Sequence, residues 1–294
     1  MRYGFSAWVA VLGTLLSCAH PALATPALES ATSCNAPSGW ETVAEAAEGR
    51  VLFIGEVHGN TETPDAFVRY VCAAAAQGGS TLVLLELPPH HEPAMREAMA
   101  SDDPRAALLT GLGTHWKTQD GRGSGAMLDM MADLMSLAKT NTQLSIEPFS
   151  LFLLKEFPTP EETMEWVANL SADEMQEQGE AGMAQEILRR SVGYDRTIVL
   201  AGNVHAAQVS ISGGGVASAA MRVPGTISVD VVHDGGDSWI QRNSEGGIQS
   251  FSPRNPRKEP ADTMALSSAY NPHFHGFLSV GTISASPPAL SDVP

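Results

Sequence analysis

The feature that most constrains the fold is a short apolar run that ends in ionisable side chains. Val51–Ile54 is followed by Gly55, and then Glu56 and His58 stand two residues apart. Such a run indicates a buried strand. The residues from Thr61 to Asp65 are typical of a helix N-terminus, with a threonine as the cap and acids in the first turn. Strand, polar tip and helix in this order are how open α/β sheets place reactive groups at the carboxyl ends of their strands.

Further apolar runs along the chain end in the same way. Residues 81–87 carry Glu86 before two prolines, residues 143–149 carry Glu147, and residues 197–201 are followed by Gly-Asn-Val-His, which ends at His205. Runs without polar alternation are typical of strands that are buried on both faces, as in parallel sheets. Helical patterns lie between them. The sequence therefore predicts an α/β fold with an open, largely parallel sheet flanked by helices.

The remaining boundaries follow from composition and periodicity. Helices are expected over residues 42–47, 66–76, 92–110, 127–138 and 160–190. Another strand is expected over 226–233, with Trp239 and Ile240 paired next to it. Beyond Gly246 the chain is rich in Pro, Ser and Asn and loses its periodicity, apart from one ordered-looking stretch at 271–277. We therefore expect one α/β domain over 40–245 and an irregular C-terminal extension over 246–294, with a disordered tail from 284.

The N-terminal residues resemble an export signal. Arg2 is followed by an uncharged, mostly apolar run over 5–16, which is too short to span a bilayer, and then by Ala22-Leu23-Ala24. We expect cleavage after Ala24, so that residues 1–24 are a signal peptide and the mature protein is periplasmic or secreted. A lipid anchor at Cys18 is the competing interpretation. No other run is long enough to be a membrane span.

The net charge and the cysteine content indicate which classes of partner and which redox compartment suit the protein. The formal net charge of −16 argues against a nucleic-acid partner, which would need clustered Lys and Arg. A small-molecule or peptide-like substrate is compatible with it. Loss of residues 1–24 leaves Cys34 and Cys72, which either form one disulfide in an oxidising compartment or are two separate buried thiols.

The strand ends define a candidate site. Because the carboxyl ends of parallel strands meet at one edge, side chains that are far apart in sequence can converge there. The expected catalytic residues are Glu56, His58, Glu86 and His205. Imidazoles and carboxylates can hold a divalent metal, with His58, His205, Glu86 and Glu147 as ligands, or can carry out acid–base chemistry without one. Each residue alone has a simpler explanation, since strand-end glutamates often cap helices and single histidines are often structural.

Other histidines are less informative. His90, His91, His115 and His233 are expected at the surface or in a lid. His273 and His275 alternate as on a strand, so they either face one ligand or lie in an exposed loop. The chain has no P-loop, dinucleotide fingerprint, Gly-x-Ser-x-Gly elbow or Cys-x-x-Cys, which argues against nucleotide-binding, classical serine-hydrolase and thioredoxin-like functions.

Three motifs together resemble one protein superfamily. They are Phe-Ile-Gly-Glu-Val-His-Gly at 53–59, Leu-Glu-Leu-Pro at 85–88 and Ala-Gly-Asn-Val-His-Ala at 201–206. They are similar to motifs of the superfamily that joins ChaN-like haem-binding uptake proteins, erythromycin esterases and Tiki/TraB-type proteins. The similarity covers roughly residues 48–235. The two residues between Gly55 and His58 match the ChaN-like and Tiki-type spacing, whereas esterases usually have three.

The resemblance implies an α/β core with a site built from Glu56, His58, Glu86 and His205, and Gly55, Gly59 and Asn203 are expected beside the ligand. It implies an exported hydrolase in which histidines hold a metal or a water and a carboxylate, Glu86 or Glu56, takes the proton from that water. The alternative is a non-catalytic haem- or iron-binding uptake protein, in which the histidines would be axial ligands.

Overall fold

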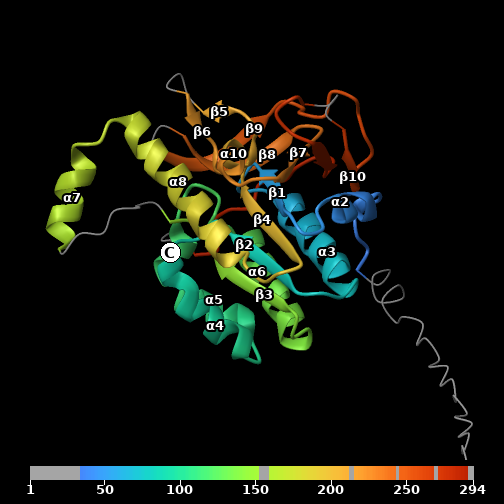
Figure 1. The fold of residues 1–294 in the computed structure, drawn as a ribbon, viewed down its shortest axis with the longest axis horizontal. Helices are drawn as coiled ribbons and strands as arrows, with labels where there is room; N and C mark the ends of the chain where they lie inside the picture. The colour runs from blue at the N-terminus through green and yellow to red at the C-terminus, as the bar shows by residue number, and fades with distance from the viewer. Residues whose placement is uncertain (1–33, 152–158, 212–214, 243–244, 268–270, 291–294) are drawn as a thin grey trace, which may run out of the picture.

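The structure is a computed structural model that describes residues 34–151, 159–211, 215–242, 245–267 and 271–290. The expected signal peptide and Cys18 lie outside these residues. Within them, a central sheet is covered by helices on both faces, as Figure 1 shows. The α/β fold with a largely parallel sheet is confirmed.

The central sheet has seven strands in the order β10-β11-β7-β1-β4-β2-β3. All neighbours are parallel except β10 and β11. The strands are β1 (Val51–Glu56), β2 (Thr81–Leu85), β3 (Leu144–Pro148), β4 (Arg196–Gly202), β7 (Ile227–Val232), β10 (Thr263–Leu266) and β11 (Gly276–Ser279). Two small antiparallel pairs stand apart from it, β5 (Ser210–Ile211) with β6 (Val216–Ala217) and β8 (Gly236–Arg242) with β9 (Glu245–Phe251).

The helices follow the strands in the predicted alternation. They are α2 (Trp40–Ala46), α3 (Glu62–Ala76), α4 (Glu92–Ala100), α5 (Pro104–Gly111), α6 (Gly125–Thr140), α7 (Pro160–Ala168), α8 (Ala172–Arg190), α9 (Asn203–Ala206) and α10 (Ala219–Arg222), with the short 3-10 turns η1 (Pro89–His91) and η2 (Gly113–Lys117). The expected helix over 160–190 is two helices, because Ser171 caps a new one in a capping box with Glu174.

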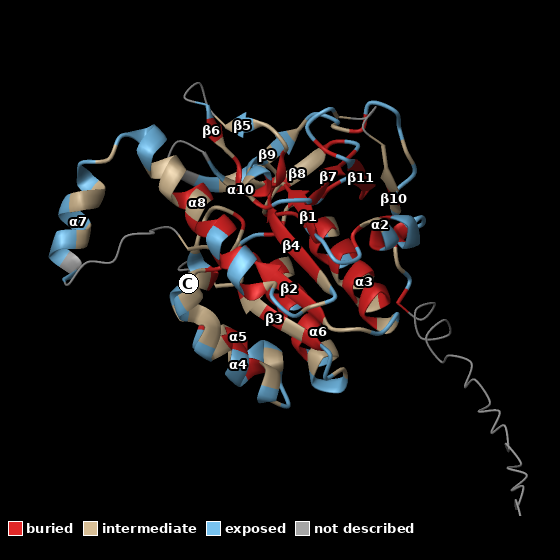
Figure 2. Cartoon of the chain, viewed as in Figure 1, coloured by how far each residue is buried: buried red, intermediate tan, exposed pale blue. Residues whose placement is uncertain are grey.

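Two apolar clusters cover the two faces of the central sheet, and its inner strands β1, β2, β4 and β7 are buried along almost their whole length (Figure 2). Side chains alternate along each strand, so Leu52 and Ile54 pack with α3 and α6, while Phe53 packs on the opposite face with α8. Burial on both faces explains why these strands are continuous apolar runs. It also leaves their polar tips as the place where side chains can reach solvent.

The expected C-terminal extension is not irregular. The predicted boundary at 245 falls at the start of β9, and β11 lies parallel to β7 inside the central sheet. The described part of the tail, residues 284–290, is also packed, since Ser286 Oγ accepts a hydrogen bond from the Ala126 N–H and the Leu290 N–H donates to the Trp116 carbonyl. The prediction was wrong because β10 and β11 have four residues each, too few for a periodic signal.

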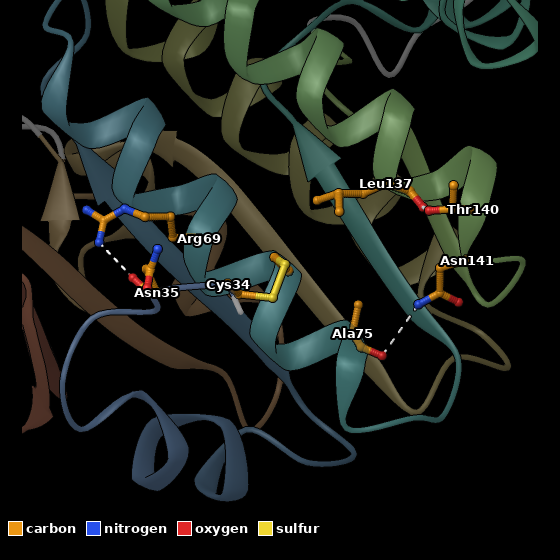
Figure 3. Close-up of a disulfide and its surroundings, with 8 residues drawn as sticks. Cys34, Asn35, Arg69, Ala75, Leu137, Thr140 and Asn141 are labelled. Carbon is orange, nitrogen blue, oxygen red and sulfur yellow. Dashed lines mark hydrogen bonds between the residues drawn. A yellow bond between two sulfur atoms is a disulfide. The ribbon is translucent and has the colours of Figure 1, made fainter. Parts of the chain in front are cut away.

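A disulfide joins Cys34 to Cys72 of α3, with 5.7 Å between their Cα atoms. Figure 3 shows Cys34 lying beside this helix, on which Arg69 also donates to the backbone carbonyl of Asn35. Of the two interpretations of these cysteines, the disulfide is therefore confirmed. Among the described residues, no helix combines the length and apolarity that crossing a bilayer requires.

Candidate functional site

The four expected catalytic residues converge at the carboxyl ends of three adjacent strands. β4 lies between β1 and β2 and pairs in parallel with both, with Glu56 in register with Gly202. Glu56 therefore ends β1, Glu86 follows β2, and His205 stands on the one-turn helix α9 directly after β4. The sheet order thus brings together residues that are up to 149 positions apart in sequence (205 − 56).

The first imidazole is held by the carboxylate on its own strand. His58 Nδ1 lies 3.0 Å from Glu56 Oε1, and the Glu56 residue is only 2% exposed. A carboxylate only accepts hydrogen bonds, so Nδ1 carries a proton and Nε2 points away from Glu56. The backbone around His58 is closely packed, since a Cβ at Gly59 would lie 1.9 Å from the Trp239 carbonyl oxygen. Gly59 also has a positive φ, and only glycine fits there.

Glu86 lies between the two imidazoles. Its Oε2 is 3.8 Å from His58 Nε2, and its Oε1 is 3.9 Å from His205 Nε2. Arg122 Nη1 donates to Oε1 at 2.8 Å, and the Gly202 N–H donates to Oε2 at 2.7 Å. A side chain at Gly202 would meet all three groups, because its Cβ would be 3.2 Å from His58 Nε2. This glycine therefore makes the close gathering possible.

The second imidazole is held by a glutamate that the sequence did not predict. His205 Nδ1 lies 2.6 Å from Oε1 of Glu180 on α8, and Glu180 is completely buried. The other oxygen of Glu180 accepts the Ala219 N–H at 2.7 Å, and Gln176 Nε2 donates to Oε1 at 2.5 Å. Both histidines are therefore fixed in the same way, with Nδ1 on a buried carboxylate and Nε2 directed at Glu86.

A sequence signal for Glu180 exists but is weak. Acidic residues dominate the first half of α8, which is typical of a solvated helix face. Around Glu180, however, the sequence is Gly-Glu-Ala-Gly at 179–182, and small residues indicate close packing. A Cβ at Gly182 would lie 2.1 Å from the Leu151 carbonyl oxygen. Arg122 was missed as well, because it lies in a Gly-rich loop without periodicity.

The charges of this cluster shift the pKa values of its members. Burial lowers the pKa of His58, but the carboxylates of Glu56 and Glu86 outweigh burial and leave this pKa raised. Burial also lowers the pKa of His205, but the hydrogen bond to Glu180 and the charge of Glu86 outweigh burial and leave this pKa raised. For Glu86 burial raises the pKa, but the histidines, Arg122 and the Gly202 N–H outweigh it and lower the pKa. Glu86 is therefore held as a carboxylate.

A cavity of about 350 Å³ opens beside His205. Glu86, Arg122, Glu180 and His205 form its polar side. Leu151, Met175 and Met183 give it an apolar side, which comes from α8 and from the segment after β3. Its volume is in the range of pockets for small ligands. The arrangement offers a cavity for a small molecule with imidazole, carboxylate and guanidinium groups on one side, and His58 stands behind Glu86 without lining it.

Several expected site residues lie elsewhere. Glu147 pairs with Arg190 at 2.5 Å and lines no part of the cavity, so it was wrongly grouped with the histidines. Gly55 lies against α9, where its Cβ would be 2.8 Å from that of Ala206. Asn203 lines a different cavity. Gly55, like Gly59 beside Trp239, allows a close approach of the backbone, and neither glycine nor Asn203 lines the cavity beside His205.

The other histidines have separate surroundings. His233 is 1% exposed and packs edge-on against Phe251, so its expected place at the surface was wrong. His90, His91 and His115 form a row of ring contacts. His275 Nδ1 accepts the Ser228 N–H, whereas His273 borders the cavity that Asn203 lines. His273 and His275 therefore do not share one ligand site.

The side chains of the cluster are not spaced to hold a metal ion between them. In the described part of the chain, no three His, Cys, Asp or Glu side chains have the spacing of a metal site. Both oxygens of Glu86 already accept hydrogen bonds and lie where an ion between the histidines would be. No step of the mechanism proposed below uses a metal ion or a haem.

Comparison with solved structures identifies similar folds at low sequence identity. A Bacillus cereus protein matches with a TM-score of 0.61 at 11% identity, over 90% of this chain and 99% of that one. A succinoglycan biosynthesis protein matches with a TM-score of 0.60 at 11% identity, over 89% of this chain and 97% of that one. A mutant of erythromycin esterase EreC in its open conformation matches with a TM-score of 0.58 at 11% identity, over 85% of this chain and 94% of that one.

The fold of the chain is similar to that of erythromycin esterase EreC. This likeness agrees with the α/β core that the resemblance of the Gly-Glu-Val-His and Gly-Asn-Val-His motifs implies. No protein-family description and no curated protein sequence matches the chain. At 11% identity the comparisons establish the fold, and the chemistry has to be argued from the residues of this chain.

Proposed function

We propose that the protein is an exported hydrolase that cleaves an ester or amide bond of a small-molecule or peptide-like substrate with a water activated by a histidine. The observation that carries this proposal is the pair of imidazoles, each fixed through Nδ1 by a buried carboxylate, whose Nε2 atoms face Glu86 from 3.8 and 3.9 Å. An orienting acid behind each imidazole is the arrangement used for general acid–base catalysis.

His58 is the proposed general base. Its Nδ1 proton is donated to Glu56, so the neutral ring has a lone pair on Nε2 that can accept a proton from water. The 3.8 Å gap between Nε2 and Glu86 Oε2 is too long for a hydrogen bond, but a water about 2.8 Å from both atoms fits it. Glu86 itself is a weaker base than expected, because its pKa is lowered. Its part is to orient the water.

His205 is the proposed general acid. Glu180 and Glu86 raise its pKa, which favours the protonated ring, and this ring can donate its proton from Nε2 to the leaving group. Arg122 lines the same cavity and can stabilise negative charge that develops on the carbonyl oxygen. Acid–base help of this kind contributes about 10²–10⁴-fold to a rate. No described residue favours the haem-binding alternative over this mechanism.

Export is part of the proposal. The Cys34–Cys72 disulfide supports it, because structural disulfides persist in oxidising compartments and are rare in the cytosol. Cleavage after Ala24 would leave both cysteines in the mature protein. The intact mass of the protein isolated from the cell envelope or the medium tests this cleavage site. A mature protein that begins at a lipidated Cys18 would show that the protein is anchored to the membrane by a lipid instead.

Hydrolysis of a panel of short-chain aryl esters and peptide amides by purified mature protein tests the function. We expect activity in the parent and a loss of at least about 100-fold in His58→Ala and in His205→Ala. His90→Ala is the matched control, since His90 is exposed and makes ring contact only with His91 among the described residues. Equal activity in all four proteins would refute the proposal, as would a Soret band on haem addition that both site variants lose while the parent hydrolyses nothing.

A further inference from the structure

A second cavity lies on the other side of the turn that carries His205. It has a volume of about 380 Å³ and is open to solvent. Asn203 and Val204 of α9 form one wall, and Asn271, His273 and Phe274 of the stretch before β11 form another. This stretch is the ordered island within the C-terminal sequence that the hydrolase site does not use. The cavity shares no lining residue with the one beside His205.

A buried carboxylate holds the polar groups of this cavity in place. Asp230 lies in the middle of β7 and is 2% exposed, an unusual position for an acid in a parallel strand. Arg254 Nη2 donates to both of its oxygens, at 3.1 and 3.0 Å, and Asn271 Nδ2 donates to Oδ2 at 3.2 Å. Asp230 therefore fixes two side chains that line the cavity.

Arg254 retains unused hydrogen-bond donors. Its contacts with Asp230 use Nη2 alone, and its Nε and Nη1 have no partner among the described residues. The side chain is 33% exposed. Burial raises the pKa of Asp230, and the charge of Arg254 only partly offsets this. The guanidinium is thus oriented by Asp230 through Nη2, and its other nitrogens can still donate to an anion from solvent.

The rest of the lining is mainly apolar. Val204, Val209, Ile211 and Phe274 surround the cationic end, and His273 stands at the exposed rim. In a chain with a net charge of −16, a cavity with Arg254 and His273 and no acidic lining residue selects for anions. Apolar walls beside one cation favour a singly charged ligand with an apolar body over a fully hydrated multivalent anion.

We propose that this cavity binds a small monocarboxylate with a short alkyl or aryl chain, whose carboxylate pairs with Arg254 and whose chain packs against Phe274 and Val209. The site is separate from the hydrolytic cluster and does not depend on the proposed function. His273 adds a further donor at the rim.

Calorimetric titration with hexanoate, with hexanamide as the neutral isostere and with inorganic phosphate, tests the proposal. We expect hexanoate to bind at least tenfold more tightly than hexanamide or phosphate. In the double variant Asp230→Asn/Arg254→Gln, which removes both charges without leaving a buried one unpaired, we expect at least tenfold weaker binding. Arg105→Gln, which breaks an exposed ion pair with Asp129, is the matched control and should bind like the parent.

The outcomes separate this proposal from the hydrolase. His58→Ala should bind hexanoate like the parent even if it hydrolyses nothing. If the double variant fails to fold, His273→Glu decides, because its exposed side chain leaves the fold unchanged and its charge should weaken hexanoate binding several-fold. Absence of hexanoate binding at about 10 mM, equal binding of hexanamide, equal binding of phosphate, or unchanged binding in the folded variants would each overturn the proposal.

Discussion

Glu180 lies 2.6 Å from His205 Nδ1 although its side chain is completely buried and comes from a different helix. The contact mirrors the one between Glu56 and His58, so two separate carboxylate–imidazole pairs face each other across Glu86. A buried carboxylate is retained where it is paired and hydrogen-bonded. Its place behind His205 indicates that the orientation and charge of this ring matter.

Replacement of Glu180 tests that role. In Glu180→Gln the pKa of His205 should fall, so the decline of kcat/KM at high pH should begin at lower pH, with activity at neutral pH reduced about tenfold or more. Glu177→Gln is the control, because Glu177 lies three positions earlier on α8 and its carboxylate makes a partly exposed ion pair with Arg222 rather than a contact with His205. An unchanged pH profile in Glu180→Gln would show that the glutamate only supports the fold.

The free energy of unfolding should decrease at both high and low pH. The pKa values of His58 and His205 are raised by folding, so their stabilisation is complete below about 6.5 and is lost as the pH rises through the folded values. The pKa of Glu86 is lowered, so its contribution is complete above about 4.5 and is lost as the pH falls through its folded value. Urea unfolding across pH should give a maximum between these limits. In His58→Ala/His205→Ala a decline on the alkaline side as steep as in the parent would contradict this.

Chelation should leave the proposed activity unchanged. The cluster holds Glu86 with Arg122 and Gly202 rather than leaving its oxygens free for an ion. Activity after dialysis against EDTA, with metal content measured on the same sample, should equal that of the untreated protein. Loss of activity that zinc or another divalent ion restores would favour the metal-dependent form of the hydrolase instead.

The disulfide should contribute to stability. Cys34 and Cys72 are 38 positions apart, and closing a loop of this size stabilises by about 3–4 kcal/mol in the chain-entropy account. The double variant Cys34→Ala/Cys72→Ala should lose roughly this amount in urea unfolding, and the parent should lose it on reduction. Two reactive thiols per chain in the non-reduced protein would contradict the assignment.

The sequence predicted most of the central sheet and four of the site residues because both leave strong local patterns. Buried parallel strands are continuous apolar runs, and an ionisable residue at the end of such a run stands out, as Glu56 and Glu86 do. It could not predict Glu180, which lies among exposed acids on α8, or Arg122, which lies in an irregular loop. Their positions depend on tertiary packing alone.

The errors have the same cause. Glu147 follows the strand pattern as well as Glu86 does. However, β3 is the edge strand, and the carboxylate of Glu147 forms an ion pair with Arg190 of α8. The four-residue strands β10 and β11 are too short to show alternation, so their place in the sheet is visible only through their partners. Pairing across the sheet, which a single sequence does not encode locally, decides both cases.

The pH dependence of kcat/KM for the best ester of the panel tests the central claim most directly. If neutral His58 is the base and protonated His205 the acid, the profile is bell-shaped, and its acidic limb has a midpoint above 6.5, because the pKa of His58 is raised. The two limbs belong to the coupled pair, and each should disappear in the variant that lacks its histidine. We predict that His58→Ala loses the acidic limb together with at least about 100-fold in rate. A His58→Ala profile that keeps both limbs and the parent rate would contradict the account.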